Sequence, residues 1–295
     1  SSRLVIDVTP ADPNYVYLVS SDYSYVFQGL YRSTDSGTTF TKTRETKNIF
    51  ENTQSWYDLA LSVSDTNPNI VFVGCLNIWK STNGGDTFNR INYWASPKQV
   101  TYTHADIHYL RYFNGELYCG SDGGFYLSNN DGATFTSYTK GLQIGQFYKI
   151  SVAQNSSSDR LVGGLQDNGG FGLRGTQWNV YHGADGMDCV VDTRNPNVYY
   201  GFIQYGRYLY KTEDRGLSNK YVASGPSTGN WVTPLAMDTD GVIYAGYKGF
   251  YKLEGNAFTK ISTFNFTGNI DHIEIDPHNN STIYVAHDYN LHKST

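Results

Sequence analysis

The sequence predicts an all-β fold built from seven copies of one antiparallel unit, and three observations carry this prediction. An octamer recurs at residues 33–40, 81–88 and 128–135, with its first serines 48 and 47 residues apart. A fixed period of this size is typical of one supersecondary unit copied along an array. The 295 residues include 26 Tyr, 15 Phe and 30 Gly but only 17% charged residues, which favours short strands and tight turns. The third observation is a strand pair that occurs seven times.

These strand pairs alternate apolar and polar residues, and a polar turn joins the two strands of each pair. In order along the chain they cover residues 5–19, 59–74, 107–120, 149–164, 187–201, 234–246 and 270–287. Each unit leaves apolar faces exposed on its own, and radial stacking with closure covers them. The sequence therefore predicts a seven-bladed β-propeller that occupies residues 1–295 as one domain.

Each octamer has the chemistry of a turn between two strands. Its third residue is Asp or Asn, whose side chain accepts hydrogen bonds from the backbone amides ahead of it. Its fifth residue is glycine, which adopts a positive φ without strain. Thr and Phe then begin the next strand, and we expect the ring to fill the space between neighbouring sheets. The defining residues are Ser33, Asp35, Gly37 and Phe40, then Ser81, Asn83, Gly85 and Phe88, then Ser128, Asn130, Gly132 and Phe135.

Later units carry less of the octamer. Residues 211–216 form a worn copy, and residues 251–258 keep only a hairpin. The final residues, Lys293, Ser294 and Thr295, match the start of an octamer. We therefore expect the last blade to lack its outermost strand in this chain and the chain to be a fragment of a larger multidomain protein.

The octamer resembles the Asp box of the bacterial neuraminidase (BNR) repeats found in sialidases, xyloglucanase-like glycosidases, sortilin-type receptors and secreted bacterial propellers. Residues 55–61, 104–108, 120–124, 164–169 and 183–187 further resemble propellers of large secreted proteins of Bacteroidetes. The resemblance implies that the box joins the two outer strands of a blade. It also implies a secreted or cell-surface bacterial protein with further domains in the same polypeptide, and it says little about activity.

Charge and hydropathy exclude several classes of partner. A net charge of -5 leaves no broad basic surface for nucleic acid. No run of about 18 apolar residues is present, so we expect no insertion into a membrane. The apolar stretch of a signal peptide is missing at the N-terminus, which is expected of a mature or partial chain. Three cysteines, an odd number, predict buried free thiols.

His104, Asp106 and His108 are candidate metal ligands and candidate ligand-binding residues. They are predicted to alternate along one strand, so their side chains should point to the same face. His and Asp are good ligands for a divalent metal. A buried row of His, Asp and His that is hydrogen-bonded to the neighbouring backbone has the same sequence, so both interpretations stay open.

A second group of candidates lies beside glycines, where the inner strands are expected to turn. Asp122, Asp167 and Asp185, with Gln166 and Asn168, are predicted to line one mouth of the propeller channel and to bind ligand there. Oxygen ligands of this kind suit Ca²⁺. Asp-Gly is also the commonest hairpin chemistry, which is the alternative explanation. We expect no other cofactor.

The predicted function is non-catalytic. We expect a rigid binding or scaffold module whose partner is a polysaccharide or a protein of the cell surface or secretion system. Exposed aromatic rings stack on sugars, and Trp79, Trp94, Trp178 and Trp231 are the candidate platforms, although most such rings should pack between blades.

The alternative is a glycoside hydrolase, xyloglucanase-like or sialidase-like. In a xyloglucanase-like enzyme, two carboxylates act as acid and base, and Asp58 and Asp106 are the acids to test first. A sialidase needs three converging arginines, and such a set is not apparent among the ten arginines of the sequence.

Overall fold

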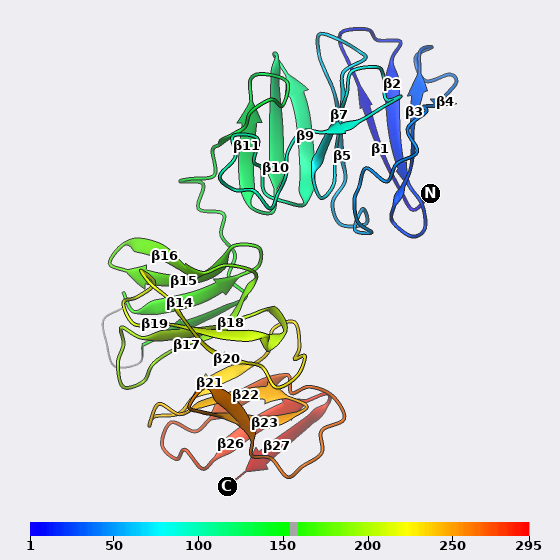
Figure 1. Ribbon diagram of the computed structural model, residues 1–295. Helices are drawn as coiled ribbons and strands as arrows, with labels where there is room; N and C mark the ends of the chain where they lie inside the picture. The colour runs from blue at the N-terminus through cyan, green and yellow to red at the C-terminus, as the bar shows by residue number, and fades with distance from the viewer. Residues whose placement is uncertain (154–158, 295) are drawn as a thin grey trace. The chain divides into compact units, whose positions relative to one another are not determined.

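A computed structural model describes residues 1–153 and 159–294 and divides the chain into two compact units, Ser1–Gln143 and Ile144–Thr295. Each unit is a row of antiparallel sheets, which we call blades 1 to 7 in chain order (Figure 1). In every blade, consecutive strands pair as a meander, so the first strand of each blade forms one edge of the sheet. Thr295, the last residue of the octamer-like terminus, lies outside the described residues.

The first unit contains three four-stranded blades. Their strands are β1 (Arg3–Val8), β2 (Val16–Ser21), β3 (Phe27–Ser33) and β4 (Thr41–Lys42) in blade 1, β5 (Ala60–Val63), β6 (Val71–Gly74), β7 (Ile78–Ser81) and β8 (Asn89–Arg90) in blade 2, and β9 (Ile107–Phe113), β10 (Glu116–Ser121), β11 (Gly124–Ser128) and β12 (Thr136–Ser137) in blade 3.

The second unit contains three four-stranded blades followed by one of three strands. The strands are β13 (Lys149–Val152), β14 (Leu161–Leu165), β15 (Gly169–Arg174) and β16 (Gln177–His182) in blade 4, β17 (Gly186–Val191), β18 (Tyr199–Ile203), β19 (Tyr208–Thr212) and β20 (Lys220–Ser224) in blade 5, β21 (Leu235–Met237), β22 (Ile243–Tyr247), β23 (Gly249–Glu254) and β24 (Ala257–Lys260) in blade 6, and β25 (His272–Ile275), β26 (Ile283–His287) and β27 (Asn290–Ser294) in blade 7. A 3₁₀ turn, η1, spans Gln204–Gly206.

The predicted fold class is confirmed. The described residues form seven antiparallel blades, and the seventh lacks a fourth strand, as expected from its sequence. All seven predicted strand pairs are the first two strands of a blade. Among the described residues, no helix is long and apolar enough to cross a membrane. The assignment of residues 1–295 to one domain stays a prediction.

The four best octamer turns share one hydrogen-bond pattern. In the first turn, the Ser33 hydroxyl accepts from the Gly37 amide at 2.9 Å, and the Asp35 carboxylate accepts from the Thr39 amide at 2.8 Å. The corresponding bonds occur in the second and third copies. The copy at residues 211–216, which has lost part of the octamer sequence, keeps both bonds: the Thr212 hydroxyl accepts from the Gly216 amide at 2.9 Å, and the Asp214 carboxylate accepts from the Ser218 amide at 2.9 Å. The turns join the third and fourth strands.

Side-chain acceptors connect the first strands of successive blades. The Asp7 carboxylate of β1 accepts from the Val63 amide of β5 at 2.8 Å, and the Ser62 hydroxyl of β5 accepts from the Tyr112 amide of β9 at 2.7 Å. In the second unit, Ser151 accepts from Val191 and Asp188 accepts from Leu235, both at 3.1 Å. Because an edge strand presents unpaired amides, these four contacts satisfy donors that sheet pairing leaves open. We call them the hub latches.

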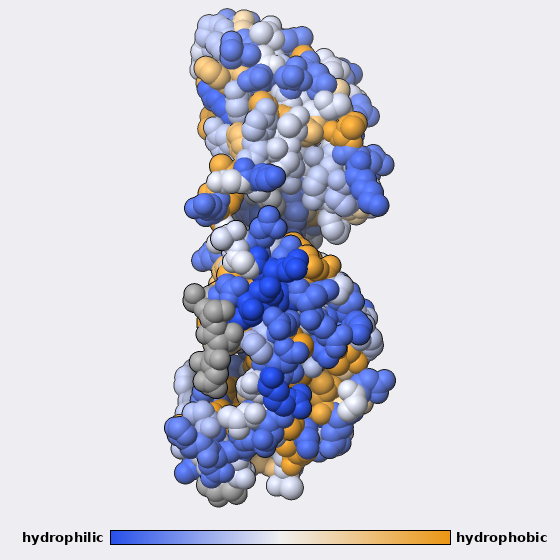
Figure 2. Space-filling model, turned by 90° about the vertical axis from the view of Figure 1, so that its left-hand side faces the viewer, coloured by the Kyte–Doolittle hydropathy of each residue, from blue (hydrophilic) through white to orange (hydrophobic). Residues whose placement is uncertain are grey.

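The apolar core lies between neighbouring blades rather than at one centre. Separate clusters fill the spaces between blades 1 and 2, 2 and 3, 4 and 5, 5 and 6, and 6 and 7. Of the octamer rings, Phe88 is 6% exposed in such a cluster, as expected, whereas Phe40 is 40% exposed. All three cysteines are buried free thiols, as predicted. Figure 2 shows hydrophilic and apolar side chains interspersed over the face of the units that it presents.

Candidate functional site

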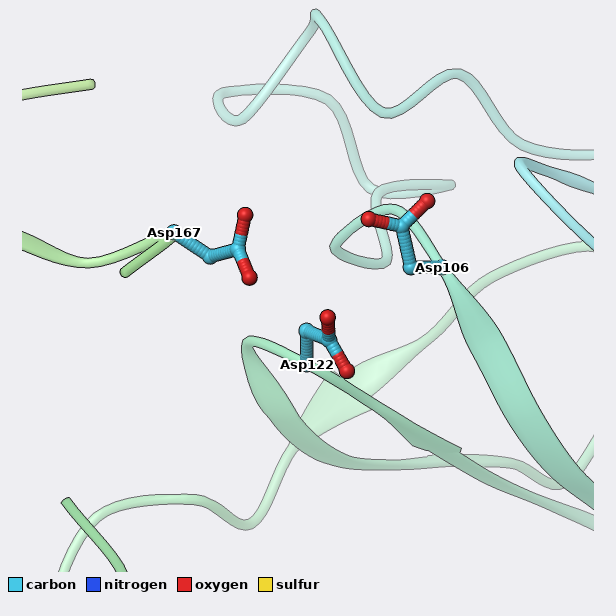
Figure 3. A group of neighbouring side chains, drawn as sticks. All are labelled: Asp106, Asp122 and Asp167. Atoms are coloured by element: carbon cyan, nitrogen blue, oxygen red, sulfur yellow. The ribbon is translucent and has the colours of Figure 1, made fainter. Parts of the chain in front are cut away.

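The predicted ligand-binding residues of the first unit gather at one end of blades 2 and 3. Asp58 lies just before β5, Asp106 just before β9, His108 at the start of β9, and Asp122 in the β10–β11 turn. Figure 3 draws Asp106 and Asp122. Loops that enter the first strand and turns that leave the second therefore supply the functional side chains.

The expectation that His104, Asp106 and His108 alternate along one strand is wrong. Strand β9 begins at Ile107, and Asp106 has a φ of 63°, a left-handed conformation that is not that of a strand residue. His104 instead lies over the β10–β11 turn, where a Cβ at Gly123 would overlap its imidazole ring. Glycine at this position lets the loop of His104 approach the turn closely.

Two aromatic rings and an ion pair form a continuous surface, which we call the aromatic–carboxylate patch (Trp56, Tyr57, His108 and Asp122). The Tyr57 hydroxyl donates to Asp122 at 2.7 Å, and His108 Nε2 lies 2.6 Å from the other Asp122 oxygen. The Tyr57 ring meets the His108 ring edge-on at 4.7 Å and lies 5.6 Å from the Trp56 ring. Trp56 is 62% exposed and Tyr57 is 40% exposed. The hydrogen bond to Asp122 raises the pKa of His108.

The loop that presents Trp56 is held from both sides. Arg3 donates to the Ser55 carbonyl at 2.9 Å, and the Ser55 hydroxyl donates to the Tyr25 carbonyl at 2.8 Å. Ser55 is fully buried. The exposed indole is therefore carried by an anchored backbone, which limits the entropy that binding would cost.

Asp58 and Asp106 are brought together behind the patch. The Gln54 side-chain amide donates to Asp58 at 3.0 Å and also to Asp106. The Cys75 thiol donates to the second Asp58 oxygen at 3.2 Å. Burial raises the pKa of Asp58 to about 6, against the opposing effect of these hydrogen bonds, and burial also raises the pKa of Asp106.

This arrangement does not resemble a glycosidase pair. Such a pair flanks the scissile bond, with about 5 to 9.5 Å between the two carboxyl groups. Here the Gln54 amide occupies the space between Asp58 and Asp106, and Asp58 is 0% exposed. In this conformation Asp58 has no surface with which to contact a substrate.

Metal binding by His104, Asp106 and His108 stays a prediction. Each already contacts protein: His104 Nδ1 lies 3.2 Å from the Ala105 carbonyl oxygen, Asp106 accepts from Gln54, and His108 contacts Asp122. A metal ion would have to displace the Asp122 carboxylate from His108 or bind both groups. Calcium binding is likewise an expectation only.

The remaining candidates belong to the second unit. Gln166, Asp167 and Asn168 form the β14–β15 turn, and Asp185 lies just before β17. The Asp185 carboxylate accepts from the Asp167 amide at 2.8 Å. Asp167, also drawn in Figure 3, has a φ of 61°, which is typical of an Asx turn residue. That these residues share one channel mouth with Asp122 stays a prediction.

Gln166 joins an aromatic group of the second unit. The Tyr148 hydroxyl donates to the Gln166 side chain and accepts from the Trp231 indole at 3.1 Å. Trp231 in turn lies 5.1 Å from the Tyr205 ring, edge-on. One of the predicted platforms, Trp231, is therefore part of a polar and aromatic network at a loop end, whereas Trp79 is 4% exposed and belongs to the core.

Sequence reasoning missed three residues of the site: Gln54, Trp56 and Tyr57. The available signal was an aromatic pair beside an amide and a carboxylate, in the loop that leads into a first strand. A Trp in that position is solvent-exposed because the loop lies beyond the end of the sheet, whereas Trp79 lies within a strand.

No protein-family model and no curated protein matches the sequence. Among solved structures, the chain is similar to a GH74 enzyme of Niastella koreensis, with 17% identity, a TM-score of 0.35, and coverage of 98% of this chain and 57% of that one. It is similar to YCF48 from Cyanidioschyzon merolae, with 14% identity, a TM-score of 0.37, and coverage of 95% and 91%. It is also similar to the WD40 β-propeller domain of Doa1, with 14% identity, a TM-score of 0.38, and coverage of 99% and 95%. The fold assignment rests on the seven antiparallel sheets themselves.

Proposed function

We propose that the chain is a non-catalytic Asp-box propeller of a secreted or cell-surface bacterial protein, and that it binds a polysaccharide at the aromatic–carboxylate patch. The observation that carries this proposal is the 62% exposure of Trp56 on an anchored loop, beside the Asp122 carboxylate. The hydrogen bonds of the octamer turns, with an Asx side chain capping the turn and a glycine closing it, support the Asp-box assignment.

The patch offers both kinds of contact that a sugar ring needs. The apolar face of a pyranose stacks on an indole or phenol ring, and exposed rings of this size supply most of the contact area. Sugar hydroxyls also form hydrogen bonds with carboxylates, and the Asp122 carboxylate, which accepts from Tyr57 and contacts His108, belongs to the same patch as the rings. Trp56 and Asp122 therefore fix a sugar by stacking and by directional hydrogen bonds.

The charges of the patch favour a neutral polysaccharide. Asp106 lies close enough to Asp122 for the two carboxylates to interact electrostatically, and this repulsion contributes to the raised pKa of Asp106. The patch itself contains one histidine and no arginine. A carboxylated or sulfated sugar would be repelled here, in contrast to a sialidase site with its converging arginines.

Affinity gel electrophoresis and calorimetry with soluble neutral polysaccharides, such as xyloglucan and glucomannan, test this proposal. Trp56→Ala should weaken binding at least about tenfold, which corresponds to a loss of about 1.4 kcal/mol. Trp94→Ala is the matched control, because Trp94 is also exposed, at 44%, but lies outside the patch. Equal affinity of the Trp56→Ala variant and the parent chain would refute the site.

Two other outcomes are informative. Capture of a cell-surface protein that Trp56→Ala abolishes, with no affinity for glycans, would replace the polysaccharide by a protein partner. Release of reducing sugar that Asp106→Asn abolishes would show hydrolysis, and the non-catalytic assignment would then be wrong.

A further inference from the structure

Two tyrosines occupy the same place in two blades and share an unusual backbone conformation. Tyr25 lies in the turn between β2 and β3 of blade 1, and Tyr205 lies in the turn between β18 and β19 of blade 5. Their φ angles are 62° and 60°. This left-handed conformation strains a residue with a bulky side chain, whereas glycine adopts it freely. Both turns would favour glycine at this place, so the tyrosines are better explained by what their rings contact.

Each tyrosine is held by the loop that leads into the first strand of the next blade. The Tyr25 carbonyl accepts from the Ser55 hydroxyl of the blade 2 loop at 2.8 Å. The Tyr205 carbonyl accepts from the Gly229 amide of the blade 6 loop at 2.9 Å, and the Tyr205 amide donates to the Trp231 carbonyl at 3.1 Å. The same two elements therefore meet in both units of the chain.

The two loops also present an aromatic ring in the same register. In blades 2 and 6, the glycine near the end of the second strand is bonded or paired to Ala60 and to Pro234, respectively. The residues three positions before these two are Tyr57 and Trp231. Trp231 of the second unit is therefore the counterpart of Tyr57 in the aromatic–carboxylate patch.

Both rings are fixed through a polar group at their edge. The Tyr57 hydroxyl donates to the Asp122 carboxylate at 2.7 Å. The Trp231 indole donates to the Tyr148 hydroxyl at 3.1 Å, and this hydroxyl in turn donates to the Gln166 side chain. Because a ring held in this way is already ordered, a ligand that stacks on it or beside it loses little affinity to further ordering.

The second unit offers its aromatic surface mainly through two tyrosines. Tyr148 is 43% exposed and Tyr205 is 44% exposed, whereas Trp231 is partly buried and packs on the cluster between blades 5 and 6. The Tyr205 ring meets the Trp231 ring edge-on at 5.1 Å. Two half-exposed phenol rings therefore contact one indole, and the three rings come from blades 4, 5 and 6. We call them the tyrosine–tryptophan cluster (Tyr148, Tyr205 and Trp231).

We propose that the tyrosine–tryptophan cluster is a second binding site for a neutral polysaccharide, in addition to the aromatic–carboxylate patch. The proposal rests on the proposed function of that patch, because it extends the same chemistry to the corresponding elements of the second unit. The exposed tyrosines stack on the apolar faces of sugar rings. The hydrogen-bonding groups of the cluster and of Gln166 are a phenol, an indole and an amide, which are uncharged and therefore suit a neutral sugar.

The indole signals in two-dimensional ¹H–¹⁵N NMR report on the two sites separately. The full chain is titrated with short oligosaccharides of xyloglucan and of glucomannan, and Trp231→Phe identifies the Trp231 signal. We expect the Trp231 signal to shift as well as the Trp56 signal. The Trp94 signal is the control and should stay in place, because Trp94 belongs to neither site. In Trp56→Ala, the shift of the Trp231 signal should persist.

Tyr205→Gly tests the role of the tyrosine ring. Glycine relieves the left-handed strain, so the melting temperature of the variant should equal or exceed that of the parent chain. The affinity that the Trp231 signal reports should nevertheless fall at least about tenfold. Tyr205→Phe is the matched control, because it keeps the ring, and it should bind like the parent. A lower melting temperature with unchanged affinity would show that Tyr205 only supports the fold, and the second site would be wrong.

The results of the titration separate the two proposals. A Trp56 signal that shifts while the Trp231 signal stays in place would overturn the second site and leave the first. A shift of the Trp231 signal without one of the Trp56 signal would support the second site and refute the first. If neither signal responds to either kind of oligosaccharide, both sites are wrong.

Discussion

Protonation of Asp58 should stabilise the first unit as the pH falls. Asp58 is fully buried, and its pKa rises from 3.8 in the unfolded chain to about 6 in the fold. A folded pKa above the unfolded one means that the folded state binds the proton more tightly, so ionisation of Asp58 costs stability above pH 6. This difference in pKa corresponds to about 3 kcal/mol of lost stability when Asp58 is fully ionised. At pH 4.5 the protonation of Asp58 restores about 2 kcal/mol of it.

Urea unfolding of the parent chain and of Asp58→Asn, each at pH 7.5 and pH 4.5, isolates this contribution. The variant cannot titrate at this position. When the pH is lowered from 7.5 to 4.5, the free energy of unfolding of the parent should therefore increase by about 2 kcal/mol more than that of the variant. Glu274→Gln, an exposed carboxylate in the second unit, is the control and should show no such gain.

Because Asp106 shares the Gln54 amide with Asp58, the two carboxyls titrate as a pair, and Asp106→Asn should lower the pKa of Asp58. A pH-independent difference between parent and Asp58→Asn would refute the reasoning.

Three further predictions concern the turns, the latches and metal. Gly85→Ala should destabilise the protein by more than about 2 kcal/mol in thermal unfolding, because the φ of 90° at Gly85 and the nearby Leu30 side chain both oppose a Cβ atom. Gly115→Ala is the control: Gly115 has a φ of 78°, but no atom lies within 4 Å of the added Cβ, so the substitution should cost only about 1 kcal/mol. Ser62→Ala should cost about 1 to 3 kcal/mol in urea unfolding, because it leaves the Tyr112 amide buried without an acceptor; an unchanged midpoint would show that the latch contributes nothing. Dialysis against EDTA should leave polysaccharide affinity unchanged, because His104, Asp106 and His108 already contact protein groups. A loss of binding that added calcium or zinc restores would contradict this prediction.

The sequence predicted those parts of the fold that depend on neighbouring residues. The octamer at Ser33 and the strand pairs follow from alternation and turn chemistry, which act over fewer than about ten residues. The copy at Thr212 differs from the other octamers in residue identity but not in bonding, because a threonine hydroxyl accepts from the Gly216 amide as serine does in the other copies.

The site was less predictable, because its geometry depends on contacts between distant loops. Gln54 bridges Asp58 and Asp106, and the latter lies 52 residues away from it. Nothing in the local pattern around Asp106 reveals its positive φ, which moves it out of the predicted strand. The sequence singled out Asp58 and Asp106 only as acids to test, and their proximity, their burial and their shared amide depend on contacts between distant loops.

The hub latches have a directional consequence. In all four, the acceptor belongs to the earlier blade and the donor to the next one along the chain. In these four pairs, a blade that emerges during synthesis thus already carries the oxygen that accepts from its successor, and one amide of the successor's edge strand is paired as soon as that sheet forms. A paired edge amide is not available to a strand from another molecule, so the same contact favours sequential growth of the array and disfavours intermolecular β-pairing.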